Sequence, residues 1–402
     1  MTFELELRFQ VPTQRYARAR RALVAKTARS IEAPEEPAKP KELGGHAQRA
    51  KRISRSISCQ GTTVEVSTLA RRIDDGATGE PRGELVFRWV DGPVQGLLAL
   101  ADRWVDRYGL WLYEAQPDTS IDPPRPNLSR HQSPDAALRC MVRDCLARVL
   151  PNLSAIACDR GTPEHLHQLR VGLRCMRSAL REFAGWSRDR DPRWEAELKQ
   201  LFGRLSQARD LDVLDSVLIP QLRAAGGPEI ELSARALVEP AATVLRCEST
   251  TKLLLALIVF ARSAPNPDGA ATASLKELAD ASLRRQHRRL RKAAALFMSA
   301  DTATKHRLRK RLKRLRYCIE LCDALYRGKA IARYIVLLRE AQDELGRYMD
   351  LAMAQTYFRA QTAHDARAWF AVGWFSARHE PGLQAAVQAL EALEAGPRFW
   401  RP

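Results

Sequence analysis

The chain has 402 residues, of which 45% are hydrophobic, and its 65 Lys and Arg against 47 Asp and Glu give a net charge of +18. This length and composition predict two or three domains with real cores. The longest apolar run, residues 253–261, is too short to cross a bilayer. The eight cysteines form no C-x-x-C pair, which excludes a short-spaced zinc or redox motif. We expect a soluble cytoplasmic protein with free thiols and no membrane span.

The first 120 residues predict a small α/β domain. Apolar and charged residues alternate over 3–11, as in a strand, and a helix is expected over 13–30. After a loop rich in Pro, Gly and charge, the pattern predicts strands at 52–58, 62–70 and 83–90 and a helix at 94–108. Five prolines between 117 and 134 mark the end of this domain.

From about residue 134 onward the pattern is helical, which predicts an all-α domain over 130–400. Turn signals at GG226, PNPDG (265–269) and EPG (380–382) separate the helices. The fold class is therefore α+β, with a duplication of two helical bundles at about 130–262 and 270–400. The helices are expected at 134–150, 162–184, 191–206, 210–225, 229–262 (with a break near Pro240), 272–299, 302–326, 330–345, 348–362 and 382–394.

A basic helix face occurs twice, about 139 residues apart, in HLHQLRVGLRCMRSALR (165–181) and KHRLRKRLKRLRYCIEL (305–321). At 100° per residue, the basic positions of each helix fall within an arc of about 80°, beside an apolar stripe. Two helices with the same charges at the same spacing predict one anion site with two halves, a cationic groove or pore. We define the first ridge as His167, Arg170, Arg174, Arg177 and Arg181, and the second ridge as His306, Arg309, Lys313 and Arg316, with Lys310 beside it.

The local charge favours a phosphate-rich partner. Residues 283–317 hold fourteen Lys or Arg and a single acid, Asp301. RRQHRRLRK (284–292) is expected to form a further wall of the same cavity, through Arg284, Arg288 and Arg291. Arg139 and Arg143, which precede the first ridge, are expected to form the corresponding wall beside that ridge. A solvated outer face remains the alternative for a single basic helix. Each histidine is either a donor on its ridge or a packed residue near a helix start.

The pattern H-x-x-R-x-x-x-[RK]-x-x-R, present twice, resembles the CHAD family of α-helical domains. RLRYCIEL (314–321), LSQARDLDVL (205–214) and LGRYMDLAMA (345–354) fit the same family, and the resemblance spans about 130–400. It implies two helical bundles around a basic cavity that binds inorganic polyphosphate, often on polyphosphate granules. In a supporting role we expect Arg209, Asp210, Tyr317 and Asp350, as residues that orient the ridges or as purely structural ion pairs.

The N-terminal strand carries an E-x-E-x-R motif that resembles the opening of CYTH domains, the triphosphate tunnel metalloenzymes. In that family, strand carboxylates hold a divalent metal. Here GELVFRWVDG (83–92) keeps Glu84, but Val86 and Arg88 occupy the places of two further glutamates. We therefore expect a degenerate scaffold without catalytic residues or a cofactor, with Glu4, Glu6 and Glu84 as weak metal candidates.

The leading hypothesis is a non-catalytic polyphosphate-binding protein in the cytoplasm, associated with polyphosphate granules and possible granule-protein partners. One alternative is a metal-dependent triphosphatase or polyphosphatase that acts through the N-terminal domain. A second is a general nucleic-acid binder, although no recognition motif accompanies the basic stretch at 284–292. The sequence does not indicate the oligomeric state.

Overall fold

The computed structural model describes residues 5–24, 53–71, 82–114, 127–205, 218–230, 239–266, 273–326 and 328–400. Glu4, Arg209 and Asp210 lie outside these residues, so their expected roles stay predictions. The chain forms two compact units. The first contains residues 1–121, 147–169 and 241–263, and the second contains 122–146, 170–240 and 264–402. The first unit therefore joins the N-terminal region to helical segments from the predicted all-α domain.

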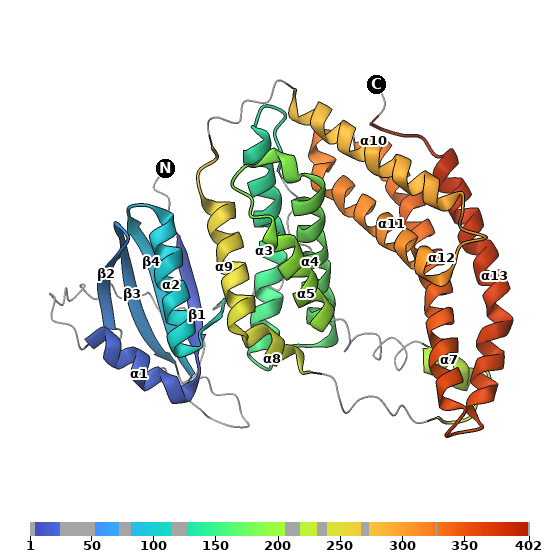
Figure 1. Ribbon diagram of the computed structural model, residues 1–402, viewed down its shortest axis with the longest axis horizontal. Helices are drawn as coiled ribbons and strands as arrows, with labels where there is room; N and C mark the ends of the chain where they lie inside the picture. The colour runs from blue at the N-terminus through green and yellow to red at the C-terminus, as the bar shows by residue number, and fades with distance from the viewer. Residues whose placement is uncertain are drawn as a thin grey trace, which may run out of the picture. The chain divides into compact units, whose positions relative to one another are not determined.

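The first unit contains a small antiparallel sheet of five strands, in the order β2-β3-β4-β1-β5 (Figure 1). The alternation that predicted β1 places Leu7 and Phe9 on a buried face and Glu6 and Arg8 on the opposite, polar face. Of the strands, the two-residue β5 escaped prediction. The strands are β1 (Glu6–Val11), β2 (Ile53–Cys59), β3 (Thr62–Arg71), β4 (Arg82–Asp91) and β5 (Trp111–Leu112).

Two helices, α1 (Thr13–Val24) and α2 (Val94–Tyr108), pack on the sheet. Phe87 links the sheet to α2, because its ring centroid lies 5.2 Å from that of Phe9 and 5.5 Å from that of Trp104. α2 also packs against α9 (Glu248–Arg262), which follows α8 (Ala241–Arg246). The predicted 229–262 helix is thus interrupted, since the described helices begin just after Pro240 and break again at Cys247.

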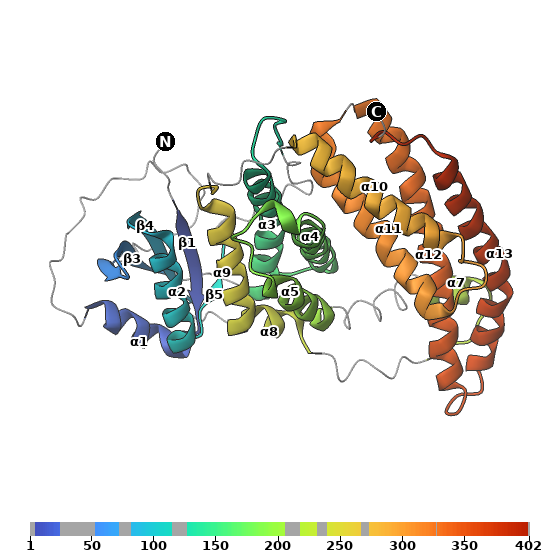
Figure 2. The same ribbon diagram turned by 45° about the horizontal axis from the view of Figure 1, so that its top comes forward.

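The second unit is helical. α10 (Leu275–Ala294) and α11 (Thr302–Cys322) lie side by side, as do α12 (Gly328–Gln361) and α13 (Ala368–Ala395) (Figures 1 and 2). Side-chain caps start the first pair: Ser274 forms a capping box with Glu277, and the Asp301 carboxylate accepts from the Thr304 amide at 2.8 Å. The other α-helices that the structure describes in this unit are α5 (Arg193–Arg204) and α7 (Ile219–Ala224), together with parts of α3 (Pro134–Ala157) and α4 (Pro163–Glu182).

Two predictions in this unit were wrong. Helices expected at 330–345 and 348–362 form the single 34-residue α12, with Gly346 inside it. The turn expected at 380–382 lies within α13, which includes Pro381 and begins at Ala368 rather than at residue 382. Glycine costs about 1 kcal/mol and proline about 3 kcal/mol in a helix interior, and the packing of α12 and α13 along each other can offset these costs.

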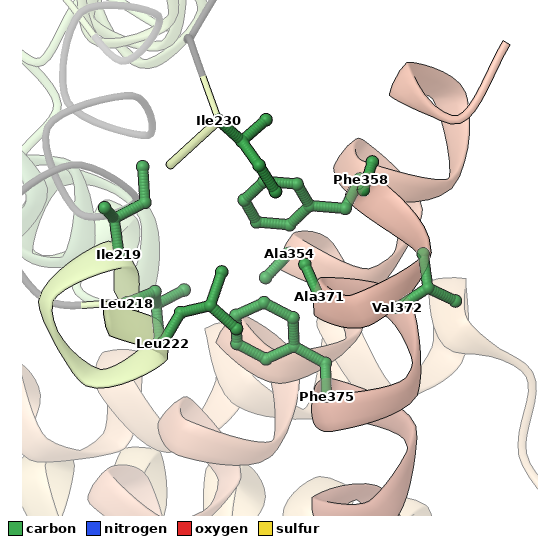
Figure 3. Close-up of a cluster of buried hydrophobic side chains, with 10 residues drawn as sticks. Leu218, Ile219, Leu222, Ile230, Ala354, Phe358, Ala371, Val372 and Phe375 are labelled. Carbon is green, nitrogen blue, oxygen red and sulfur yellow. The ribbon is translucent and has the colours of Figure 1, made fainter. Parts of the chain in front are cut away.

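The C-terminal part of α12 and the N-terminal part of α13 enclose a separate apolar cluster with α7 (Figure 3). The rings of Phe358 and Phe375 stack, with centroids 5.7 Å apart. Leu222 of α7 and Ile230 pack into the same cluster. This cluster anchors α7 to the second unit.

Candidate anion-binding site

The first ridge lies on α4 and the second on α11, and each helix buries the apolar stripe that the sequence predicted. Leu169, Leu173 and Leu180 of α4 are fully buried, and so are Leu312 and Ile319 of α11. The stripes fix the rotation of both helices, so the basic side chains lie beside the core rather than in it.

The two helices come together through Arg174 of the first ridge and Tyr317, the residue that follows Arg316 of the second ridge. The Arg174 Nη1 atom donates to the Tyr317 hydroxyl at 3.5 Å, and the Tyr317 side chain is buried. Beyond this contact, Glu182 at the end of α4 pairs with Arg314 of α11, with Oε1 and Nε 3.5 Å apart. The second halves of α4 and α11 therefore face each other within one compact unit.

The cations of the two helices are close enough to repel. Burial lowers the pKa of Arg177, and Arg314, Arg181 and Arg174 act in the same direction, while the Glu195 carboxylate opposes them. Burial likewise lowers the pKa of Arg314, with Arg181 adding to the effect and Glu182 opposing it. Like charges held together in this way favour a bound anion.

The members of the first ridge have different surroundings. Arg170 is buried, and its Nη1 atom donates to the Leu205 carbonyl at the end of α5 at 2.7 Å. The guanidinium carbons of Arg170 and Arg174 lie 4.8 Å and 4.9 Å from the centre of the Phe202 ring. Arg170 thus fastens α4 to α5, whereas Arg174 is only partly buried.

In the second ridge, Arg309 lies over the α12 backbone. Its Nη2 atom is 3.8 Å from Asp350 Oδ1, and a Cβ at Gly346 would approach the same Nη2 to 3.3 Å. Gly346 and Asp350 therefore provide the room and the charge that place Arg309. Further along, Arg316 lies 3.8 Å from Glu320 on its own helix. Lys313 is half-buried, and Lys310 is exposed.

The two histidines belong to different units. His167 is half-buried on the part of α4 that belongs to the first unit, and His306 is exposed in the second. Their expected common role stays a prediction.

The residues predicted before the first ridge have other partners. Arg139 is buried, with its Nε 2.9 Å from Asp135 Oδ2 and its Nη2 2.5 Å from Asp189 Oδ2. Arg143 is exposed and contacts the Cys140 sulfur at 3.2 Å.

Of the residues predicted on α10, two have partners outside α4. Arg284 donates to the Trp400 carbonyl at 3.4 Å, and Arg291 lies 3.9 Å from Glu394 of α13. Arg288 is exposed. Arg285 of α10 does contact α4, with its Nη2 atom 3.5 Å from the Glu182 carbonyl.

Sequence reasoning missed four residues of this region: Glu182, Glu195, Arg285 and Arg314. An acid directly after Arg181, in a strongly basic helix, was the available signal for Glu182. Arg314 lies one residue past Lys313, outside the arc of the ridge. Nothing in the local pattern of α5 distinguishes Glu195 from other exposed helix acids.

The polar face of the N-terminal sheet is an ion-pair cluster. Arg8 lies 2.6 Å from Glu6 and 3.4 Å from Glu84, and Arg88 lies 3.5 Å from Glu6 and 3.4 Å from Glu65. The register explains this arrangement, because Arg88 on β4 is flanked by Glu6 on β1 and Glu65 on β3. Among the residues that the structure describes, no three His, Cys, Asp or Glu are grouped so as to hold a metal ion.

No helix in the described part of the chain combines the length and apolarity needed to cross a membrane.

The fold and the paired ridges define a helical domain built around two related basic helices. Residues 140–359 match the CHAD domain family, so the chain belongs to that family, as the sequence pattern indicated. It is similar to the crystal structure of the CHAD domain from the plant Ricinus communis, with 29% identity, 69% of this chain and 99% of that chain covered, and a TM-score of 0.53. No curated protein matches the chain. The CYTH-like resemblance is not shown by these comparisons.

Proposed function

We propose that this protein binds inorganic polyphosphate along the basic side chains of α4 and α11, in the region where the two helices contact each other. The observation that carries the proposal is the convergence of Arg174, Arg177 and Arg181 with Arg314 and Tyr317 in one compact unit. A linear polyphosphate carries about one charge per phosphate, and it offers non-bridging oxygens to guanidinium forks without any sequence to be read.

The charge balance around the ridges supports this proposal. Among the described residues, the carboxylates of Glu182, Glu195, Glu320 and Asp350 lie 3.4–3.8 Å from arginines of α4 and α11, helices that carry more basic than acidic residues. A polyanion would relieve the repulsion between the ridges and raise the melting temperature by linkage. Its binding would weaken as salt rises, because phosphate contacts release counterions.

We further propose that the protein is not an enzyme and that its N-terminal sheet is a degenerate CYTH-like domain. Arg8 and Arg88 pair with the carboxylates that a divalent metal would need. The expected setting is the cytoplasm, on polyphosphate granules. Metal-dependent release of phosphate from tripolyphosphate, lost in Glu6→Gln, would instead favour the triphosphatase.

The test is a titration with polyphosphate of defined length, single-stranded DNA and RNA at two salt concentrations. A ridge variant carries Arg174→Gln, Arg177→Gln, Lys313→Gln and Arg316→Gln. The matched control loses four exposed, ion-paired arginines away from the ridges: Arg193→Gln, Arg204→Gln, Arg223→Gln and Arg347→Gln.

We expect wild-type protein to prefer polyphosphate over nucleic acid at equal charge concentration. The ridge variant should bind roughly 100-fold more weakly or worse, since four charge-assisted contacts are lost. The control should change affinity by less than about threefold, through long-range charge alone. Circular dichroism and melting temperature check that both variants are folded. Full binding by a folded ridge variant would contradict the proposed site, and preference for nucleic acid would favour that alternative.

A further inference from the structure

Glu195 contributes a carboxylate to the first ridge from a neighbouring helix. It lies in the first turn of α5, next to the buried Trp194. Its Oε1 atom is 3.4 Å from Arg181 Nη1 and 3.7 Å from Arg177 Nη2. One anionic oxygen therefore sits between two guanidiniums from successive turns of α4, which is the position that a phosphate oxygen would take there.

The exposure of this group differs from that of the other carboxylate at the end of α4. The Glu195 side chain is 31% exposed, whereas that of Glu182 is 4% exposed. The Glu182 backbone carbonyl also accepts from Ser282 and Arg285 of α10, which fixes it in the helix packing. Glu195 can leave its partners for solvent, because exposed ion pairs of this kind contribute little to stability.

We propose that Glu195 is a built-in competitor of the polyanion. In the free protein the Glu195 carboxylate neutralises Arg177 and Arg181. When polyphosphate binds, one of its phosphate oxygens displaces this carboxylate. This inference rests on the proposed function and deepens it, because it concerns which anions reach the ridge.

The competition selects for long chains. A tethered carboxylate acts at an effective concentration in the millimolar range or above, so a lone phosphate or pyrophosphate displaces it poorly. A polyphosphate that is already held by other cations of the ridges presents its next phosphate at an effective concentration comparable to that of the Glu195 carboxylate. Such a phosphate can therefore displace the carboxylate. Glu195 should therefore weaken binding of short anions by at least as much as that of long ones.

The competition also changes the salt dependence. Where Glu195 already neutralises Arg177 and Arg181, the incoming phosphate releases the carboxylate rather than small anions. Without that carboxylate, the two arginines would hold solution counterions. Polyphosphate binding should then release more of them and fall more steeply with salt.

The decisive variant is Glu195→Gln, with Glu239→Gln as its control. Glu239 pairs with Arg204 of α5 at 2.7 Å, and its side chain is 41% exposed, so each change removes the charge of one partly exposed, ion-paired carboxylate. Affinities for defined-length polyphosphate and for pyrophosphate are measured at low and moderate salt. Glu195→Asp, which keeps the charge but shortens its reach, is measured beside them.

We expect Glu195→Gln to bind polyphosphate about two- to fivefold more tightly at low salt, the worth of one exposed ion pair. Its slope of log affinity against log salt should be steeper than that of wild type, because Arg177 and Arg181 then release solution counterions on binding. Pyrophosphate binding should strengthen by at least the same factor. Glu195→Asp should lie between wild type and Glu195→Gln, and Glu239→Gln should match wild type.

The outcomes separate this inference from the proposed function. If wild-type protein binds polyphosphate while Glu195→Gln matches Glu239→Gln or binds more weakly, the competitor role is overturned and the proposed function stands. If wild-type protein does not bind polyphosphate, both fail. Should Glu195→Gln not fold, Glu195→Asp decides: tighter binding than wild type supports the role, and equal or weaker binding overturns it.

Discussion

The first and second ridges place the same charges at the same helical positions, yet equivalent residues have different partners. Arg170 and Arg309 are 139 residues apart and equivalent in the repeat. Arg170 is buried and donates to a backbone carbonyl of α5, whereas Arg309 is partly exposed and faces Asp350 of α12. A repeated sequence thus determines the direction in which a side chain leaves its helix. The neighbouring helix determines whether that side chain is buried in a structural hydrogen bond or stays partly exposed as a cation.

The largest expected effect is a difference in the free energy of unfolding between alanine variants of these two arginines. Arg170→Ala should lower the free energy of unfolding by about 2–3 kcal/mol, because it removes a charged hydrogen bond in a buried place and a cation–π contact. Arg309→Ala should cost only about 0.5–1 kcal/mol, since its ion pair is partly exposed. Urea unfolding of both variants measures the difference. Equal losses would show that the two positions are structurally alike.

A second change tests whether Arg309 serves binding. Gly346→Ala places a methyl group 3.3 Å from Arg309 Nη2, so the guanidinium must shift. Alanine in a helix is more stable than glycine by up to about 1 kcal/mol, so the unfolding free energy should stay level or rise. Polyphosphate affinity, measured by titration, should fall about two- to fivefold. Unchanged affinity in the folded variant would remove Arg309 from the site.

The smallest effect concerns Tyr317 and its equivalent in the repeat, Ser178. Tyr317→Phe removes the hydroxyl that accepts from Arg174 and should cost about 0.5–1.5 kcal/mol of unfolding free energy. Ser178 instead donates to the Arg174 carbonyl of its own helix at 2.9 Å, so Ser178→Ala should be nearly neutral. Thermal unfolding of both variants compares them. A larger loss for Ser178→Ala would reverse the assignment of the inter-helix contact to Tyr317.

Much of the fold could be predicted because local chemistry dictates it. The predicted bounds of α2 match the structure, since Pro93 precedes the helix and Gly109 ends it with a φ of 63°. The breaks expected between residues 345 and 348 and at Pro381 did not occur for the opposite reason: Gly346 and Pro381 each lie inside a long helix, where packing outweighs the preference of one residue.

The rotation of the ridges was also predictable, because the apolar stripes of α4 and α11 are periodic. The burial of Arg170 was not, since it depends on Phe202 and Leu205, which are more than thirty residues away. The role of Glu195 could not be predicted from the sequence for the same reason. Its importance arises from the placement of α5 beside α4, and no residue near it in the sequence carries that information.

The first unit has a consequence for synthesis of the chain. α2 packs against α9, but about 140 residues separate the end of α2 from the start of α9. At ribosomal speeds of about 5–20 residues per second, α2 waits roughly 7–28 s for this neighbour to be made. During that interval its uncovered side is a nascent-chain surface that a chaperone can occupy, and a fragment that stops before α9 would keep it uncovered permanently.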